Sequence, residues 1–267
     1  MKEKASAGGS RVKRFDPSQD LPRQFSDSEY LQQCISGQSY SSVCFAHDGN
    51  TELVGSTRQL VGQLPFVADA KRFNYCGSIG PIAIPDQRNE RLQCIGQRLC
   101  DSFGLNGVFG FDWILDDEGC IWLIEINPRI TASCELFEAA GLGSLVGMQA
   151  GVVKYAGQAE LMNSPLKFGK AIVYSTEREP FTVDRELFEH FCNQQFSIGS
   201  IGKPASECEC GYADIPASGT VVEPGHPVVT VIESGISCEQ VHSKLVSRTK
   251  VLRQRIRKLE RNKAVRA

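Results

Sequence analysis

The chain has 267 residues, 41% of them hydrophobic and 22% charged, and its formal net charge is -2 at pH 7. These values are typical of a globular protein with one large or two modest domains. They provide no overall positive field, so we expect neither nucleic acid nor a membrane surface among its partners.

The compartment can be inferred from the cysteines and the first residues. No apolar run approaches the roughly 18 residues of a membrane span, and the opening MKEKASAGG lacks the apolar core of a signal peptide. The 11 cysteines are an odd number and are scattered along the chain, which favours a reduced, cytoplasmic setting. The one tight pair, Cys208 and Cys210, has no histidine or second pair at zinc spacing, so incidental thiols are favoured over a metal site.

The first half of the chain predicts a hairpin followed by a helix. Residues 29–61 are typical of strand, turn and strand, with the turn at Asp48–Asn50. A helix is then expected to begin near Asp86 as its N-cap and to end at Gly104. Its apolar residues recur at helical spacing on one face: Leu92, Ile95, Leu99 and Phe103.

The second half alternates short strands and helices. We expect strands at 107–115, 121–127, 172–176 and 228–232, and helices near 133–140, 144–157, 184–192 and 237–263. The last helix is basic, and a solvated or partner-facing surface is favoured for it over nucleic-acid binding. The break after Gln158 and the proline at 165 suggest a nucleotide- and metal-binding domain at 1–158, a small α/β subdomain at 159–236 and a terminal helix at 237–267.

Two strands around 107–129, GVFGFDWILDDEGCIWLIEINPR, carry the most informative polar residues. If the turn is centred on Glu118 and Gly119, Asp112 lies directly opposite Glu125. Asn127, two residues further on, projects from the same face as Glu125. Two facing carboxylates repel each other, and a divalent cation bound between them removes the conflict.

These three oxygen donors suit Mg²⁺, which keeps water molecules and completes its shell with substrate phosphates. A carboxylate pair that shares one proton or is bridged by a lysine is the alternative. Arg129, just beyond Asn127, offers a planar fork to a phosphoryl or carboxylate group.

The pattern GxxGxD followed by DxxGxxWLIEINPRITAS resembles the metal-binding signature of the ATP-grasp superfamily, and KEKASAGG resembles its phosphate-binding loop. YLQQCISGQSYSSVCF is similar to the family's hinge strand, and FNYCGSIGP to the stretch that follows it. The segment ADIPASGTVVEPGHPVVTV resembles carboxylate–amine ligases similar to tyramine–glutamate ligase and to biotin-carboxylase-like proteins. The implied fold is α+β: antiparallel sheets with helices packed on them, a small mixed α/β C-terminal subdomain and a terminal helix.

The resemblance also implies roles for individual residues. Asp112, Glu125 and Asn127 would bind one or two Mg²⁺ ions, with Mn²⁺ as a substitute, and Arg129 would stabilise the transferred group. The remaining residues that the resemblance assigns to ATP are Lys2, Gly8, Gly9, Gln32, Gln33 and Ile35. The implied reaction activates a substrate carboxylate as an acyl phosphate, which an amine then attacks.

Three departures from the family pattern are visible. Glu3 stands where proline is usual, Gln32 and Gln33 stand where glutamate is common, and Gln38 or Ser39 lies near the place of the acidic ribose ligand. The family usually opens with another domain, which we expect to be missing or supplied by a partner chain or a second copy. The alternative function is therefore a regulatory or inactive ATP-grasp remnant that binds Mg-ATP. A scaffold protein using the basic helix is a third possibility, which the Asp112, Glu125 and Asn127 pattern argues against.

Overall fold

The fold is given by a computed structural model that describes residues 1–4, 8–9, 12–14, 18, 27–68, 72–152, 165–197 and 210–266, with side chains as far as residue 260. The strands are β1 (Lys2–Glu3), β2 (Glu29–Tyr30), β3 (Gln38–His47), β4 (Asn50–Val61), β5 (Tyr75–Gly80), β6 (Gly107–Leu115), β7 (Ile121–Asn127), β8 (Lys167–Tyr174), β9 (Phe181–Thr182), β10 (Gly211–Ala213), β11 (Val221–Val222) and β12 (Pro227–Gly235). The helices are α1 (Asp86–Phe103), α2 (Cys134–Phe137), the π-helical turn η1 (Glu138–Leu142), α3 (Leu145–Gln149), α5 (Arg185–Cys192) and α6 (Cys238–Arg266).

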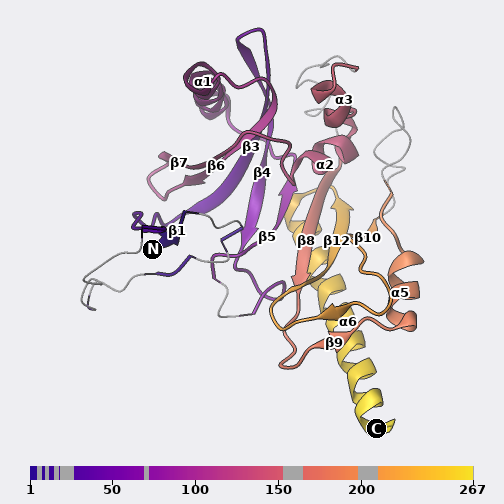
Figure 1. Ribbon diagram of the computed structural model, residues 1–267. Coiled ribbons are helices and arrows are strands. Elements are labelled where there is room, and N and C mark those ends of the chain that lie inside the picture. Colours follow the sequence, from indigo (N-terminus) through magenta and orange to yellow (C-terminus); the bar gives the residue numbers. More distant parts are fainter. Residues whose placement is uncertain are drawn as a thin grey trace.

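One antiparallel sheet of eight strands forms the centre of the molecule, in the order β10-β12-β8-β5-β4-β3-β6-β7 (Figure 1). Two small two-stranded sheets, β1–β2 and β9–β11, lie beside it. The α+β class with helices packed on antiparallel sheets is thus confirmed.

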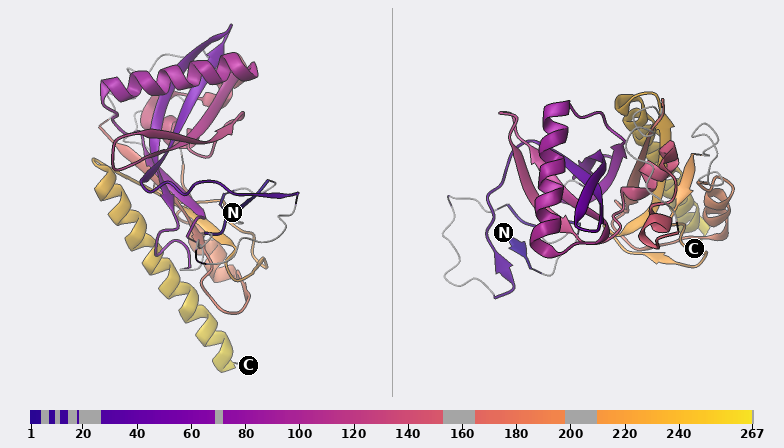
Figure 2. Two further views of the ribbon diagram at one scale, coloured as in Figure 1. Left: turned by 90° about the vertical axis from the view of Figure 1, so that its left-hand side faces the viewer. Right: turned by 90° about the horizontal axis from the view of Figure 1, so that it is seen from above.

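Helices cover the two faces of this sheet unequally. The long helix α1 crosses the strands at one end, and α6 runs along the other half (Figure 2). Alternation along β6 explains the layers: Phe109, Phe111 and Trp113 pack with α1, whereas Val108 packs with α2, η1 and α3. On that second face the short helices leave part of the sheet open, and the polar residue Asp112 lies there.

The β6–β7 hairpin pairs Asp112 with Glu125 as predicted, but its turn is not centred where it was predicted. Next to the turn, Trp113 pairs with Leu123 and Leu115 with Ile121, so the turn is centred on Glu118 alone. A bulge then shifts the register between Asp112 and Trp113, and Asp112 pairs with Glu125. The expected opposition of Asp112 and Glu125 is therefore confirmed, although the expected turn centre is one-half residue off.

Most expected elements are found, with local corrections. Asp86 is the first residue of α1 and not its N-cap as predicted, because Pro85 occupies the N-cap position, without a side-chain hydrogen bond. Gly104 ends the helix as predicted, in the left-handed conformation with φ of 60°. The expected helix at 133–140 divides into α2 and η1, which contains Gly141 at φ of 103°. The helix predicted at 144–157 ends as α3 at Gln149, and residues 153–157 lie outside the described part.

The predicted domain boundary at residue 158 also lies outside the described residues, and the division stays a prediction. β8 follows that boundary and pairs with β5, so the large sheet runs continuously through both sides of it. Among the described helices, none has the length and apolar character needed to cross a membrane.

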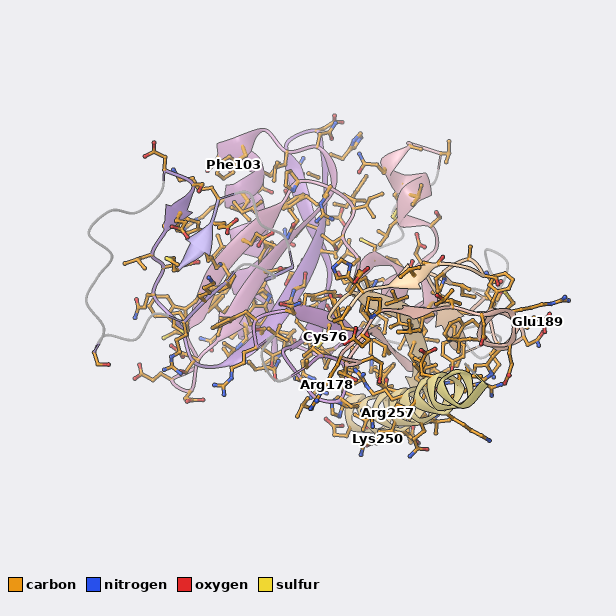
Figure 3. All side chains as sticks on the ribbon, turned by 60° about the horizontal axis from the view of Figure 1, so that its bottom comes forward. Cys76, Phe103, Arg178, Glu189, Lys250 and Arg257 are labelled. Carbon is orange, nitrogen blue, oxygen red and sulfur yellow. The ribbon has the colours of Figure 1, made fainter. Side chains whose placement is uncertain are left out.

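The C-terminal helix α6 uses many of its basic side chains within its own domain. Val241, Leu245, Leu252 and Ile256 pack into the core beside β8 and β12. Arg248 pairs with Glu233, and Arg257 with Glu177 at 3.5 Å. Figure 3 shows Lys250 and Arg257 on α6, far from Phe103 at the end of α1.

Candidate active site

A cavity of about 970 Å³ lies over the open part of the sheet, between the strands and the N-terminal segment. Polar residues of β3 to β7 form its floor, and residues 1–4, 8–9, 12–14 and 30–35 contribute another wall. All site residues expected from the sequence line this one cavity: Lys2, Gly8, Gly9, Gln32, Gln33, Ile35, Asp112, Glu125, Asn127 and Arg129. The structure therefore brings them together, whereas their individual roles stay predictions.

Three oxygen donors meet on the floor of the cavity. Asp112 on β6 faces Glu125 on β7, a pairing that places Cβ atoms roughly 4.5–5.5 Å apart. Asn127 follows on the same face of β7 and is buried. Carboxylate and amide oxygens are the ligands that Mg²⁺ prefers, so the donor set fits such an ion.

The electrostatics of Asp112 support a cation at this place. Burial raises the pKa of its carboxyl above the ordinary value, and the facing Glu125 raises it further. Hydrogen bonds from Ser41 and Gln59 and the charge of Arg129 act in the opposite direction. The net shift is upward, so the chain's own groups do not fully offset the cost of an ionised Asp112.

Arg129 lies beside the donor set and is exposed to the solvent. Its Nη2 donates to Oδ1 of Asn127 at 3.4 Å, and its Nη1 donates to the carbonyl of Ile130 at 3.1 Å. A guanidinium in this position can reach an anionic group held next to the three oxygen donors.

Gly8 and Gly9 of the N-terminal segment contact the first residue of β5 and the residues just before it. The amide of Tyr75 donates to the carbonyl of Gly8 at 2.9 Å. Gly9 has φ of +74°, and a Cβ there would meet the carbonyl oxygen of Phe73 at 1.8 Å, so only glycine fits this approach. Lys2, on β1, pairs with Tyr30 on β2 and thereby lies at the cavity wall.

The segment expected to bind adenine forms another part of the wall. Gln32 and Gln33 are exposed and Ile35 is half-buried, as suits a strip that contacts a ligand in the cavity. Of the two candidates for the ribose position, Ser39 lines the cavity. The amide of Gln38 instead donates to the carbonyls of Ser39 and Gln59, at 3.0 and 3.3 Å.

Sequence reasoning missed several residues of this cavity. Ser41, Gln59, Tyr75 and Ser78 lie on the floor, and the hydroxyl groups of Tyr75 and Ser78 are 3.0 Å apart. Serines on one face of an otherwise apolar strand were the available signal at Ser41, but Gln59 and Ser78 come from strands whose pairing the sequence does not reveal.

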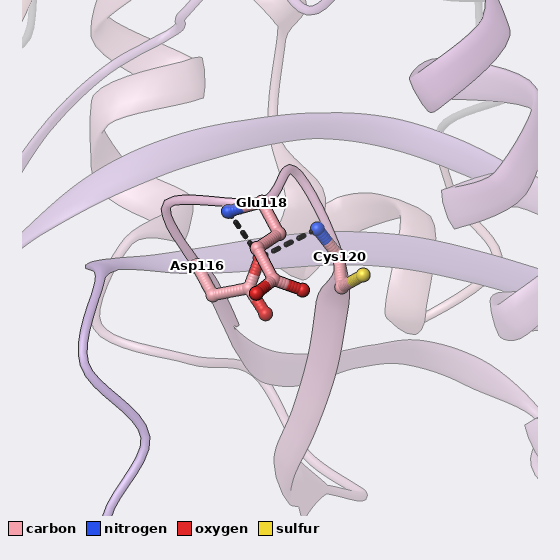
Figure 4. Close-up of side chains that lie close together, drawn as sticks. All are labelled: Asp116, Glu118 and Cys120. Carbon is pink, nitrogen blue, oxygen red and sulfur yellow. Dashed lines mark hydrogen bonds between the residues drawn. The ribbon is translucent and has the colours of Figure 1, made fainter.

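A second group of possible metal ligands lies in the β6–β7 turn. Asp116, Glu118 and Cys120 have ligand atoms within 4.8 Å of one another, the one such His, Cys, Asp and Glu cluster in the described part (Figure 4). The Asp116 carboxylate already accepts bonds from the indole of Trp122 at 2.7 Å and from the amides of Cys120 and Glu118. These bonds, with Trp122 foremost, lower the pKa of Asp116. Closing the turn therefore accounts for this cluster.

Histidines and thiols are not prominent at the cavity. None of the four histidines, all of them in described residues, lines it. The described cysteines are free thiols, and Cys34 is exposed on the cavity wall. Cys208 of the tight pair lies outside the described residues.

Sequence comparison connects the cavity to a known family. Residues 1–133 match the model of the ATP-grasp domain. Over 117 residues the chain is 29% identical to the D-alanine–D-alanine ligase of Parabacteroides distasonis. That alignment covers 42% of this chain and 36% of the relative.

Solved structures share the fold at low sequence identity. L-amino acid ligase from Bacillus licheniformis has a TM-score of 0.56 and 14% identity, covering 83% of this chain and 54% of that one. N5-carboxyaminoimidazole ribonucleotide synthetase from Thermotoga maritima has a TM-score of 0.55 and 12% identity, covering 86% and 56%. The biotin carboxylase domain of Hydrogenobacter thermophilus 2-oxoglutarate carboxylase, in complex with MgADP and bicarbonate, has a TM-score of 0.54 and 12% identity, covering 78% and 44%. The chain thus spans about half the length of these proteins.

Proposed function

The chain belongs to the ATP-grasp superfamily, and from this we propose that it is an ATP- and Mg²⁺-dependent ligase joining a small-molecule carboxylate to an amine. The observation that carries the proposal is the single cavity, which holds the Asp112, Glu125 and Asn127 donor set together with the N-terminal glycine loop. The fit of hard oxygen donors to Mg²⁺ and the glycine-only approach at Gly9 support it.

In the proposed reaction, an oxygen of the substrate carboxylate forms a bond to the γ-phosphorus of ATP. The bond from that phosphorus to the bridging oxygen breaks, and ADP leaves. The amine nitrogen then attacks the acyl carbon, inorganic phosphate leaves, and the nitrogen loses a proton to give the amide. Such chemistry depends on positioning and charge neutralisation, and no protein nucleophile is required.

Each part of the cavity has a place in this scheme. Lys2, Gly8 and Gly9 would hold the phosphates, while Gln32, Gln33 and Ile35 would contact the base. Asp112, Glu125 and Asn127 would hold one or two Mg²⁺ ions, or Mn²⁺ in their place, and the bound ions would neutralise phosphate charge. Arg129 would stabilise the transferred phosphoryl group.

The direct test is the affinity for Mg-ATP, measured by calorimetry, of the double variant Asp112→Asn, Glu125→Gln. We expect the affinity to fall by more than about 100-fold, since the loss of two ligands should exceed the loss of outer-shell partners. The matched control is Asp117→Asn, Glu118→Gln, which makes the same charge change at exposed positions of the same hairpin. An affinity that the first double variant leaves unchanged would rule out the metal site.

The second candidate function is a regulatory or inactive member that binds Mg-ATP without turnover. The observation that favours it is that Gln32 and Gln33 line the cavity at positions where the family pattern commonly has glutamate. Release of ADP, measured with a panel of amino acids as carboxylate and amine, separates the two. Turnover that appears only with a partner chain, or only in a homo-oligomer, would show where the rest of the substrate cleft comes from.

A further inference from the structure

Two buried polar side chains, Ser41 and Gln59, line the cavity on the same face of the sheet as Asp112. We propose that Ser41 and Gln59 are positioning residues, which orient Asp112 for a divalent cation by donating hydrogen bonds to its carboxylate. The inference rests on the proposed function, because it assigns an outer shell to the metal site of that function. Neither residue needs to contact the cation or the substrate for this role.

The register of the sheet places both residues at Asp112. Ser41 on β3 pairs directly with Asp112 on β6, so the two side chains project from the same face. Gln59 on β4 is two residues from Thr57, the partner of Ser41, and alternation puts it on that face too. Both are almost fully buried, at 4% and 9% exposure, and both line the cavity.

The chemistry gives the direction of these bonds. An ionised carboxylate only accepts hydrogen bonds, so the Ser41 hydroxyl and the Gln59 amide nitrogen must be the donors. Two donors occupy part of the carboxylate's roughly four acceptor sites and leave the others free. The free sites can then face Glu125 and an ion held between the strands.

Without hydrogen bonds from Ser41 and Gln59, the orientation of the Asp112 side chain would no longer be fixed. The facing Glu125 repels the Asp112 carboxylate in the orientation that a metal requires. Rotation of the Asp112 side chain away from Glu125 would relieve that repulsion and dismantle the donor set. Outer-shell partners of metal ligands typically contribute 10- to 100-fold in affinity.

The test measures Mn²⁺ binding to the full chain by electron paramagnetic resonance, with the thermal unfolding of each variant recorded in parallel. Ser41→Ala and Gln59→Met should each weaken Mn²⁺ binding by about 10- to 100-fold. Ser41→Thr, which keeps the hydroxyl, should restore most of the affinity. Ser243→Ala and Gln254→Met make the same changes at exposed positions of α6 and should leave it unchanged.

A double-mutant cycle shows whether the effect passes through Asp112. In an Asp112→Asn background, Ser41→Ala and Gln59→Met should cause little further loss of Mn²⁺ affinity. If the two substitutions reduce Mn²⁺ affinity in the Asp112→Asn background as strongly as in the wild type, Ser41 or Gln59 is an independent ligand and the inference is overturned. The inference is also overturned if the two substitutions leave the Mn²⁺ affinity of the otherwise wild-type chain unchanged. Because Ser41→Thr preserves the donor, it separates this role from a folding defect. If the wild-type chain binds no Mn²⁺, the proposed function itself fails.

Discussion

Charged side chains are paired in two different ways in the two halves of the large sheet. Beside α6, Arg253 donates to the carbonyls of Pro65, Phe66 and Tyr174 and to the hydroxyl of Thr176, and Arg248 pairs with Glu233. On the cavity floor, Asp112 and Glu125 instead face each other across one strand pair. Beside α6, each of these two arginines is paired with acceptors from the chain itself. On the cavity floor, two carboxylates face each other with Arg129 as the nearby positive charge. We expect the paired arginines to contribute to stability, and the proposed function assigns a bound cation to the two facing carboxylates.

The largest effect on stability is expected at Arg253. Its replacement by methionine removes the side-chain donor of three carbonyl groups in a buried region, of which that of Phe66 also accepts from the amide of Tyr174. We expect the free energy of unfolding to fall by about 3 kcal/mol. Denaturant unfolding measures the change. Lys250→Met, at an exposed position of the same helix, should change it little. If Arg253→Met and Lys250→Met lose the same free energy of unfolding, the hydrogen bonds of Arg253 do not contribute to stability, and the contrast between the two halves of the sheet fails.

The glycine loop provides a matched pair on the cavity side. Gly9→Ala should weaken Mg-ATP binding at least tenfold, since its Cβ would collide with the Phe73 carbonyl. Gly8 also has positive φ but has no atom within 4 Å of its Cβ position, so Gly8→Ala should have the smaller effect. Calorimetry of the two variants against wild type decides the order. A reversed order would mean that the approach to Phe73 is unimportant for the nucleotide.

Glu125→Gln should raise the stability of the metal-free protein, because it removes a like charge directly opposite Asp112. We expect a gain of about 0.5 kcal/mol in unfolding free energy. Addition of Mg²⁺ with a non-hydrolysable ATP analogue should reverse the order, because the wild type then gains more binding energy. A destabilised metal-free variant would show that the chain already neutralises Glu125.

The smallest expected effect is the contribution of His190, in the half of the sheet beside α6, to the pH dependence of stability. Burial, followed by the charges of Arg255 and Arg248, lowers the pKa of this histidine in the folded state. As the pH falls through about 6.5, the unfolded chain therefore takes up the proton first, and stability is lost. His190→Gln should reduce this loss by only about 0.3 kcal/mol, because the ring is only partly buried. Unfolding curves at pH 7 and pH 5 check it, with exposed His47→Gln as control.

How far the sequence predicts this molecule depends on the distance between the residues involved. The β6 and β7 strands and the end of α1 at Gly104 follow from local patterns, and these are confirmed. The predicted pairing of Asp112 with Glu125 is correct only because a bulge offsets the half-residue error in the predicted turn centre, and no local pattern signals that bulge.

Longer-range features could not be found in the same way. Gln59 lies on the same face of the sheet as Asp112 but on the far side of β3, an arrangement set by the strand order of the whole sheet. Arg253 has the same local pattern as the exposed basic residues of α6, and its burial depends on the carbonyls of residues 65–66 and 174. The basic helix was expected to be solvated or to face a partner, and its bonds to β12 and to Glu177 emerge only from the tertiary fold.

The most direct test of the central claim is to locate the cation itself. Crystals grown with Mn²⁺ and a non-hydrolysable ATP analogue allow the ion to be identified by its anomalous scattering. The account predicts a peak bound by Asp112, Glu125 and Asn127 in the cavity over the sheet. A peak at Asp116, Glu118 and Cys120 instead, or nucleotide density with no ion near Asp112, would contradict it.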